Sequence, residues 1–387
     1  MIFKMIRLLM IVAMNDIIMA QFSCKNRNGK SVDWFVFVPL KELSFALSSK
    51  ESFQVSLGRL EIISKNCLST EPLEKFNFIT VIIQQYELIL LYQYYNYHLQ
   101  ELFYLFYNDQ APVNEKKSHL NRAHAKGVAV FGNTSGFWLV HSVPKFPSLK
   151  RYSYAENGQT YGQSFLCVTL KTTSIKNLAN AMRYIYPEVY GITVPRNFLN
   201  RFPLLEDLKE LKKKRISNMS SLLQNFKSNG NVDFFAFSKT GKYNKDLYLD
   251  LIAKEMNVSL FAETWMNGAA KDLNSECTTK YKVINVKELN VAGDKFASNR
   301  DHSKWAIAEN KTKPLVCIGD INRQESQKKR GGGAVCLLNK NIWNLYNKSI
   351  TDVEIESIPI TLFILHFASF YLSICEWKTN GTVKKLT

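Results

Sequence analysis

The stretches "SVDWFVFV" (31–38) and "NVDFFAFS" (231–238) share the pattern Val-Asp-aromatic-Phe-x-Phe at identical spacing. Both stretches alternate and are rich in aromatic residues, which is typical of half-buried strands, and each carries a carboxylate near its start. The chain of 387 residues therefore contains an internal repeat, with one copy in each half. A repeat of this kind predicts two similar halves rather than one unbroken fold.

A His-x-Lys motif follows each copy of the repeat, and a second strand-like apolar run follows each motif. The motifs lie in "AHAKGVAVF" (123–131) and "DHSKWAIAE" (301–309), and the later runs are "GFWLVHS" (136–142) and "PLVCIGD" (314–320). Similar halves that pair about a pseudo-twofold axis bring equivalent residues together at their interface. We therefore expect His124, Lys126, His302 and Lys304 to share one cleft.

Helical patterns lie between the strand-like runs, at 174–190, 204–217 and 245–256. Strands mixed with helices indicate an α/β or α+β architecture, here with mixed β-sheets flanked by helices. We place the first half at 21–200 and the second at 201–350.

Two segments fit this organisation poorly. Residues 62–98 are rich in Ile, Leu and Tyr, and the tail at 351–387 contains a near-apolar run at 358–377 that has the length of a membrane span. His366 and several hydroxyl side chains interrupt that run, and we expect no stable membrane partner.

The N-terminus and the cysteines indicate the secretory pathway. Residues 1–20 combine basic residues, an apolar run and a small residue at the end, as a cleaved signal peptide does. The chain has seven cysteines, an odd number, so at least one is unpaired or intermolecular. None lies in a Cys/His cluster with metal-ligand spacing, which argues against a structural zinc. We expect a secreted or lysosomal protein.

The charge balance favours a polyanionic partner. The formal net charge is +17, and such an excess attracts phosphate backbones through Coulomb steering and counterion release. DNA is the partner that we expect. A basic secreted protein without such a partner is the alternative.

Together these features resemble the deoxyribonuclease II family of acid endonucleases. The resemblance runs in order from Cys24 to Tyr346, through "CKNRNGKSVDWFVF", "FYLFYNDQAPV", "HAKGVAVFGNTSGFWLVHSVPKFP", "YGQSFLCVTL", "YIYPEVY", "FAFSKTGKYNKDLY", "DHSKWAI", "CIGDINRQESQKKRGGGAVC" and "IWNLY". It implies a fold like the phospholipase D superfamily, with a single active site built from one His-x-Lys of each half. It also implies DNA cleavage that leaves 3′-phosphate ends, without a cofactor.

The resemblance further implies two disulfides, Cys24–Cys167 and Cys317–Cys336. It leaves the pairing of Cys67, Cys277 and Cys375 open.

The paired motifs suit phosphodiester chemistry. Two lysines can neutralise the charge that grows on a five-coordinate phosphorus, while one neutral histidine attacks and one protonated histidine donates to the leaving oxygen. A phosphohistidine intermediate would follow, and which histidine attacks stays open. The position five residues after each lysine, often acidic in the wider superfamily, holds Phe131 in the first half and Glu309 in the second.

We take Glu309 as a coincidence, so we expect no acid of this kind to raise the pKa of the histidines, and the sequence, which has no acidic cluster, predicts no metal site. The histidines should be protonated mainly at acid pH.

Further residues at the ends of the later strands are candidates for orienting the imidazoles or contacting phosphate: His141, Ser142, Asp320, Asn322 and Arg323. The basic, glycine-rich "RQESQKKRGGG" (323–333) is a candidate DNA contact. Two other functions stay open: a catalytically inactive DNA-binding or host-modulating protein, and a phosphodiesterase for lipids or another substrate that is not a nucleic acid. The sequence also leaves a homodimer open.

Overall fold

The computed structural model describes residues 22–25, 30–37, 46–48, 101–112, 122–150, 154, 158, 160–211, 213–214, 219–266, 271–291 and 293–354. The expected signal peptide, the atypical segment 62–98 and the near-apolar run at 358–377 lie outside these residues. Cys67 and Cys375 lie outside them as well.

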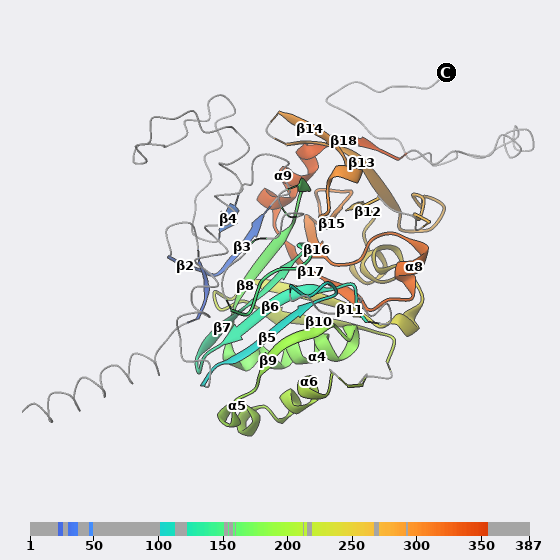
Figure 1. Cartoon of the computed structure of the whole chain (residues 1–387). Coiled ribbons are helices and arrows are strands. Elements are labelled where there is room, and N and C mark those ends of the chain that lie inside the picture. Colours follow the sequence, from blue (N-terminus) through green and yellow to red (C-terminus); the bar gives the residue numbers. More distant parts are fainter. Residues whose placement is uncertain are drawn as a thin grey trace, which may run out of the picture.

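Two large sheets dominate the described part of the chain (Figure 1). The first is seven-stranded, in the order β4-β3-β8-β7-β6-β5-β9. The second is nine-stranded, in the order β10-β11-β17-β16-β15-β12-β13-β14, with β18 paired to β13. A short ribbon of β1 and β2 accompanies the first sheet.

The strands have the following bounds: β1 (Cys24–Lys25), β2 (Ser31–Val32), β3 (Trp34–Phe37), β4 (Ala46–Ser48), β5 (Phe103–Asn108), β6 (Lys126–Phe131), β7 (Ser135–His141), β8 (Phe165–Lys171), β9 (Val189–Thr193), β10 (Ser221–Lys227), β11 (Asp233–Lys239), β12 (Leu260–Thr264), β13 (Val283–Val291), β14 (Asp294–Ala297), β15 (Lys304–Ala308), β16 (Leu315–Gly319), β17 (Gly332–Leu338) and β18 (Ile350–Val353).

The internal repeat is visible as a repeated strand order. The block β3-β8-β7-β6-β5 of the first sheet matches β11-β17-β16-β15-β12 of the second, in space and in chain order, and all its pairings are antiparallel. The two stretches of the sequence repeat form β3 and β11, and the lysines of the two His-x-Lys motifs open β6 and β15. The predicted α+β architecture is confirmed.

The copies diverge at the next strand. In the first sheet β9, which follows β8 in the chain, lies antiparallel to β5. In the second sheet β13, which precedes β15 in the chain, lies parallel to β12. The repeat therefore covers the five strands that carry the motifs, and the strand added next to this block differs between the two sheets in direction and in chain order.

The helices have the following bounds: α4 (Ile175–Ile185), α5 (Arg196–Arg201), α6 (Glu206–Glu210), α7 (Lys254–Met256), α8 (Glu325–Lys328) and α9 (Lys340–Ser349), the 3-10 turns η2 (Thr172–Ser174), η3 (Pro203–Leu205), η4 (Gly241–Tyr243) and η6 (Ser298–Arg300), and the π-helix η5 (Leu247–Ala253).

Helix α4 forms because its apolar residues recur at helical spacing. Ile175, Leu178, Met182 and Ile185 are all buried, on the side that faces the second sheet. The helix ends at Tyr186, which has a left-handed backbone and precedes a proline.

The other two predicted helices differ from the pattern. The helix expected over 204–217 is split into η3 and α6 and ends at Glu210. The carbonyl of Leu211 accepts from the guanidinium of Arg122 instead of continuing the helix. The helix expected over 245–256 is present as η5 and α7.

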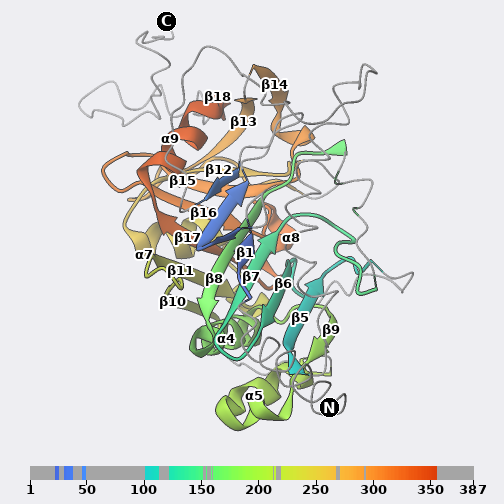
Figure 2. The same ribbon diagram turned by 90° about the vertical axis from the view of Figure 1, so that its left-hand side faces the viewer.

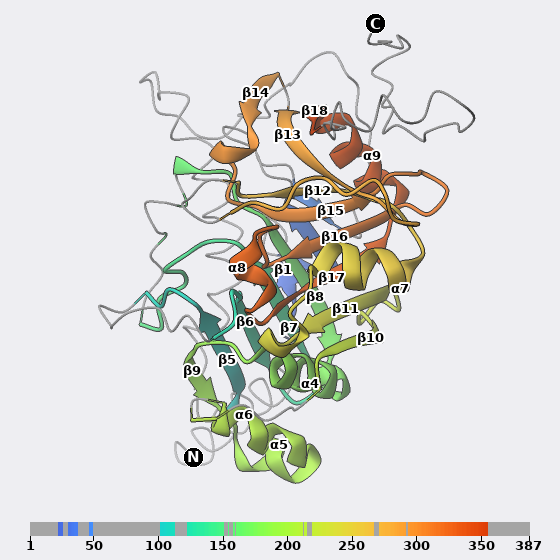
Figure 3. The ribbon, with the colours of Figure 1, turned by 90° about the vertical axis from the view of Figure 1, so that its right-hand side faces the viewer.

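The largest apolar cluster lies between the two sheets. It joins Trp138 of the first sheet, Met182 of α4, and Phe234 and Trp305 of the second sheet. Separate clusters cover the outer faces, where η5 and α7 pack on the second sheet. Figure 2 shows the strands of the first sheet side by side, and Figure 3 shows α7 and α8 on the side of the second sheet. The shared core holds the two halves together.

Both expected disulfides are present. Cys24–Cys167 ties β1 to β8 with Cα atoms 6.0 Å apart, and Cys317–Cys336 joins neighbouring strands β16 and β17 with Cα atoms 4.0 Å apart. Cys277 is also disulfide-bonded. None of the helices in the described ranges is both long and apolar enough to cross a membrane.

Candidate active site

The two His-x-Lys motifs meet where the sheets approach each other. Each lysine is the first residue of its strand, β6 or β15, and each histidine lies in the connection just before it. His124 is 8% exposed and His302 is 6% exposed, and both lysines are buried. Burial lowers the pKa of each histidine, and the charges of Lys126 and Lys304 lower it further in both cases, so the four side chains lie within one electrostatic field.

The imidazole of each histidine is held by the other half. Nδ1 of His124 lies 2.5 Å from the main-chain oxygen of Asp320, and Nδ1 of His302 lies 3.0 Å from that of Ser142. A carbonyl oxygen can only accept, so both Nδ1 atoms carry their proton and both Nε2 atoms are left for chemistry.

The two holding residues occupy equivalent places. Ser142 follows β7 and Asp320 follows β16, the matching strand of the other half. The candidate role of orienting the imidazoles is thus met in geometry by both residues, through their main chains.

The main chain repeats this exchange. The N–H of His124 donates to Gly331 (2.9 Å) and that of His302 donates to Gly162 (2.9 Å). A Cβ on Gly331 would lie 2.0 Å from the carbonyl oxygen of Ile185, so only glycine fits there. Four hydrogen bonds across the interface therefore fix the two histidines, and neither half could position its own.

The lysines differ in their partners. Nζ of Lys126 lies 2.5 Å from Oδ1 of Asp109, whereas Nζ of Lys304 donates to the carbonyl of His302. Burial, followed by the charge of Lys126, lowers the pKa of Lys304 to about 7. The pKa values of both histidines lie well below 6.5, because burial and the lysines disfavour the imidazolium. The site is therefore built to receive an anion.

Asp109 is a site residue that the sequence pattern missed. It follows β5, is buried, and places Oδ2 3.8 Å from Nε2 of His124 and 3.4 Å from Nη2 of Arg330. The expectation that no acid raises the pKa of the histidines is wrong for His124, because the charge of Asp109 acts in that direction, although burial and Lys126 lower the pKa overall. The pairing of β5 with β6 sets Asn108 opposite Lys126 and so brings Asp109 to the site. No local motif in the sequence predicts this pairing.

His141 has a structural place instead of the orienting role expected for it. Its ring packs against Phe146 and Phe165, and its Nδ1 accepts from the N–H of Val143 at 3.2 Å. Burial, followed by the charge of Lys126, lowers the pKa of His141 to about 3. It is a neutral core histidine.

Arg323 is likewise not available to a substrate. Its Nε lies 3.1 Å from Oδ2 of Asp246, its Nη1 donates to Asn285, and it is 2% exposed. The neighbouring Asn322 is buried, and its Oδ1 has no hydrogen-bond partner. Of this pair, Asn322 remains the candidate.

Part of the segment 323–333 is an internal brace, while Glu325, Ser326 and Lys329 are exposed, so its contact with DNA stays a prediction. Nζ of Lys239 donates to the carbonyls of Gln327, Lys328 and Arg330. Arg330 in turn donates to the carbonyl of Ala123 (3.1 Å), next to His124. The segment holds the second half against the first.

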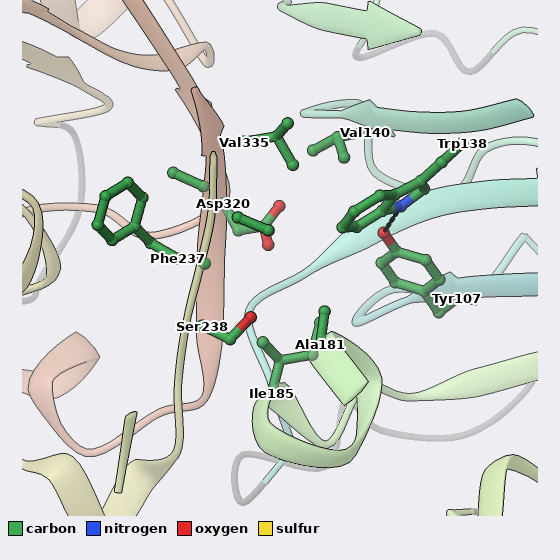
Figure 4. A pocket seen from close by; sticks show the side chains of 12 residues that line it. Tyr107, Trp138, Val140, Ala181, Ile185, Phe237, Ser238, Asp320 and Val335 are labelled. Carbon is green, nitrogen blue, oxygen red and sulfur yellow. Dashed lines mark hydrogen bonds between the residues drawn. The ribbon is translucent and has the colours of Figure 1, made fainter. Parts of the chain in front are cut away.

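The carboxyl of Asp320 lines a cavity of about 20 Å³ between the halves, together with Tyr107, Trp138 and Ser238 (Figure 4). That volume suffices for roughly one water molecule. Oδ1 of Asp320 has no hydrogen-bond partner, and burial raises the pKa of this carboxyl to about 8. Asp320 thus combines a main-chain contact to His124 with a carboxyl that is neutral in acid.

In the described part of the chain, no group of three or more His, Cys, Asp or Glu side chains is arranged to hold a metal ion.

Fold and site define an α+β protein with a histidine–lysine centre shared by two similar halves. The deoxyribonuclease II family model matches residues 23–355. Cell-death-related nuclease 7 of Caenorhabditis elegans is 36% identical over 335 residues, which cover 86% of this chain and 88% of the relative. Plancitoxin-1 of Acanthaster planci is 34% identical over 340 residues (86% and 92%), and deoxyribonuclease-2-alpha of Sus scrofa is 30% identical over 353 residues (89% and 94%).

The chain belongs to the deoxyribonuclease II family and is an endonuclease that hydrolyses DNA.

Proposed function

We propose that this protein is a secreted or lysosomal acid endonuclease that cleaves DNA through a phosphohistidine, needs no metal ion or other cofactor, and leaves 3′-phosphate ends. The observation that carries the proposal is the exchange of contacts at the two histidines, which occupies both Nδ1 atoms and leaves both Nε2 atoms for chemistry beside two buried lysines. The position of the broken bond, which leaves the phosphate on the 3′ side, rests on the family resemblance alone.

The lysines supply the charge that a cation would otherwise bring. A phosphodiester carries one negative charge, and a second develops as phosphorus becomes five-coordinate. Lys126 and Lys304 are buried, so their attraction for that charge is weakly screened. His124, Lys126, His302 and Lys304 are the catalytic residues of this proposal, and Ser142 and Asp320 position the imidazoles.

The site favours acid pH for two reasons. The pKa of each histidine lies well below 6.5, so the protonated histidine that the reaction requires is populated only in acid. The charge of Lys304, whose pKa is about 7, is lost as the pH rises through that value. The disulfides, which form in oxidising compartments, support secretion or the lysosome.

The test is nicking of supercoiled plasmid across pH 4–8, with and without excess chelator, followed by end-group analysis of the products. We expect a bell-shaped profile with its maximum below neutrality, unchanged by chelator, and 3′-phosphate ends. Activity that peaks above pH 7, or that chelator removes, contradicts the proposal.

A further inference from the structure

The pseudo-symmetry of the site is broken at one pair of equivalent positions. In the first half, β5 pairs with β6 so that Asn108 lies opposite Lys126. In the second half, β12 pairs with β15 so that Thr264 lies opposite Lys304. The next residue in each half, immediately after the strand, is therefore equivalent. It is Asp109 in the first half and Trp265 in the second.

Asp109 presents a carboxylate to the reactive nitrogen of His124. Its Oδ2 lies 3.8 Å from Nε2 of that histidine, and its Oδ1 lies 2.5 Å from Nζ of Lys126. Burial by itself raises the pKa of Asp109, but the charges of Lys126, His124 and Arg330 outweigh burial and hold the pKa below its ordinary value. The carboxyl is ionised at any pH at which the enzyme would work.

Trp265 presents an aromatic ring to His302. The two ring centroids are 4.4 Å apart at an interplanar angle of 65°, and Nζ of Lys304 lies 5.8 Å from the centroid of the indole's ring. Among the described residues, the one carboxylate within ion-pair distance of either histidine belongs to Asp109. Burial lowers the pKa of His302, and the charges of Lys304, Lys126 and His124 lower it further.

We infer that His302 is the nucleophile and His124 the general acid, with Asp109 as the residue that holds a proton on Nε2 of His124. This inference rests on the proposed function. A carboxylate opposite Nε2 favours its N–H⁺ form and repels a phosphate oxygen, which suits a proton donor. A ring that feels the charges of two lysines and contacts an indole, with no carboxylate of the described residues within ion-pair distance, keeps the Nε2 lone pair for attack on phosphorus, which suits a nucleophile.

The reaction then proceeds in two steps. The Nε2 lone pair of His302 forms a bond to phosphorus, the bond from phosphorus to the 5′ oxygen breaks, and that oxygen takes the proton from Nε2 of His124. Nε2 of His124, now neutral, then takes a proton from water as the water oxygen bonds to phosphorus. The phosphorus–nitrogen bond breaks, and its electron pair returns to His302.

An activated substrate separates the two roles. The diester thymidine 3′-(4-nitrophenyl phosphate) has a leaving group that departs without protonation, so its first step needs the nucleophile and not the acid. We expect the full-length His124→Ala variant to release about one equivalent of nitrophenolate per enzyme and then stall, because its phosphoenzyme lacks the base for hydrolysis. The His302→Ala variant should release none. Alkaline quench and peptide mapping should place the phosphate on His302.

The outcomes are distinguishable. A burst from His302→Ala but not from His124→Ala, or phosphate mapped to His124, overturns this assignment and leaves the proposed function standing. Nicking by the wild-type enzyme with no phosphate on either histidine overturns the proposed phosphohistidine route, and the assignment with it.

Asp109 is tested through the pH profile rather than through activity alone. Removing its charge lowers the pKa of His124, so the alkaline limb of kcat/KM for Asp109→Asn should move to lower pH, and Asp109→Glu should restore it in part. Trp265→Phe, the matched change in the other half, should leave that limb in place. An unshifted alkaline limb in a folded Asp109→Asn protein contradicts the role given to Asp109.

Discussion

The main-chain oxygen of Asp320 lies 2.5 Å from Nδ1 of His124, although 196 residues separate the two in the chain. The equivalent contact joins Ser142 to His302, so each half of the molecule fixes the imidazole of the other. The active centre is therefore a property of the interface, and the apolar core shared by the two sheets is what keeps it assembled.

Replacing either histidine should separate turnover from binding. We expect His124→Ala and His302→Ala each to abolish plasmid nicking, because one chemical step loses its only donor or attacking atom. Salt-sensitive binding to DNA should remain, because it rests on the distributed basic surface of a chain with net charge +17. Fluorescence anisotropy against labelled DNA across a NaCl series measures this. Loss of binding in step with loss of nicking would argue against it.

Each buried lysine should matter far more than an exposed one. Lys126→Ala or Lys304→Ala should reduce turnover by about 100-fold or more, the usual effect of losing one preorganised charge at a transition state. Lys227→Ala is the control, since that lysine is exposed and pairs with Asp233 on the surface. Single-turnover rates at acid pH measure the effect. A small effect at Lys126 and Lys304, equal to that of the control, would remove the lysines from the mechanism.

Asp320→Asn should change how stability depends on pH. The folded-state pKa of Asp320 is raised from 3.8 to about 8, so its neutral form contributes stability that is complete below about pH 4 and is lost as the pH rises to about 8. Asparagine stays neutral and keeps the main-chain contact to His124. Relative to the variant, the wild-type protein should lose up to about 1.4 kcal/mol of unfolding free energy per pH unit across that window.

Urea denaturation at several pH values between 4 and 8 measures this difference. A gap between wild type and Asp320→Asn that stays constant with pH would show that Asp320 is ionised in the folded state.

Arg323→Gln should affect the fold and not substrate binding. The guanidinium forms a buried pair with Asp246, and breaking such a pair costs about 3–5 kcal/mol because a charge is left without its partner. Thermal unfolding should show the loss, while KM for DNA of the folded protein should match that of the wild type. A raised KM at unchanged stability would return Arg323 to the substrate site.

The repeat and the chemistry of its motifs can be predicted from the sequence alone. Val-Asp-aromatic-Phe-x-Phe at the same spacing reports a repeated strand, because alternation along a strand is a local property of neighbouring residues. The two His-x-Lys motifs follow from the same logic, since the residue types needed for phosphate chemistry can be read without knowing their environment.

The roles of individual polar residues could not be read in the same way. The sequence places His141 and Arg323 near the substrate because they lie at or shortly after the ends of strands. In the structure, His141 accepts a hydrogen bond from the main chain of Val143, and Arg323 is paired with the buried Asp246. Local sequence spacing predicts where along a strand a residue lies. The partners of its side chain depend on which strands pair and which loops pack together. Asp109 was missed for the same reason, because its relation to His124 passes through the register of β5 on β6.

The sequence by itself thus determined that the chain has two similar halves, each carrying one histidine and one lysine suited to a phosphodiester. Only the tertiary structure decided that each half holds the other's imidazole, and that Asp109 and Trp265 make the two histidines unequal. The physical reason is the distance along the chain over which each kind of interaction acts. Strand propensity and side-chain chemistry act over a few residues, while hydrogen bonds and electric fields act between atoms that only folding brings within a few ångströms.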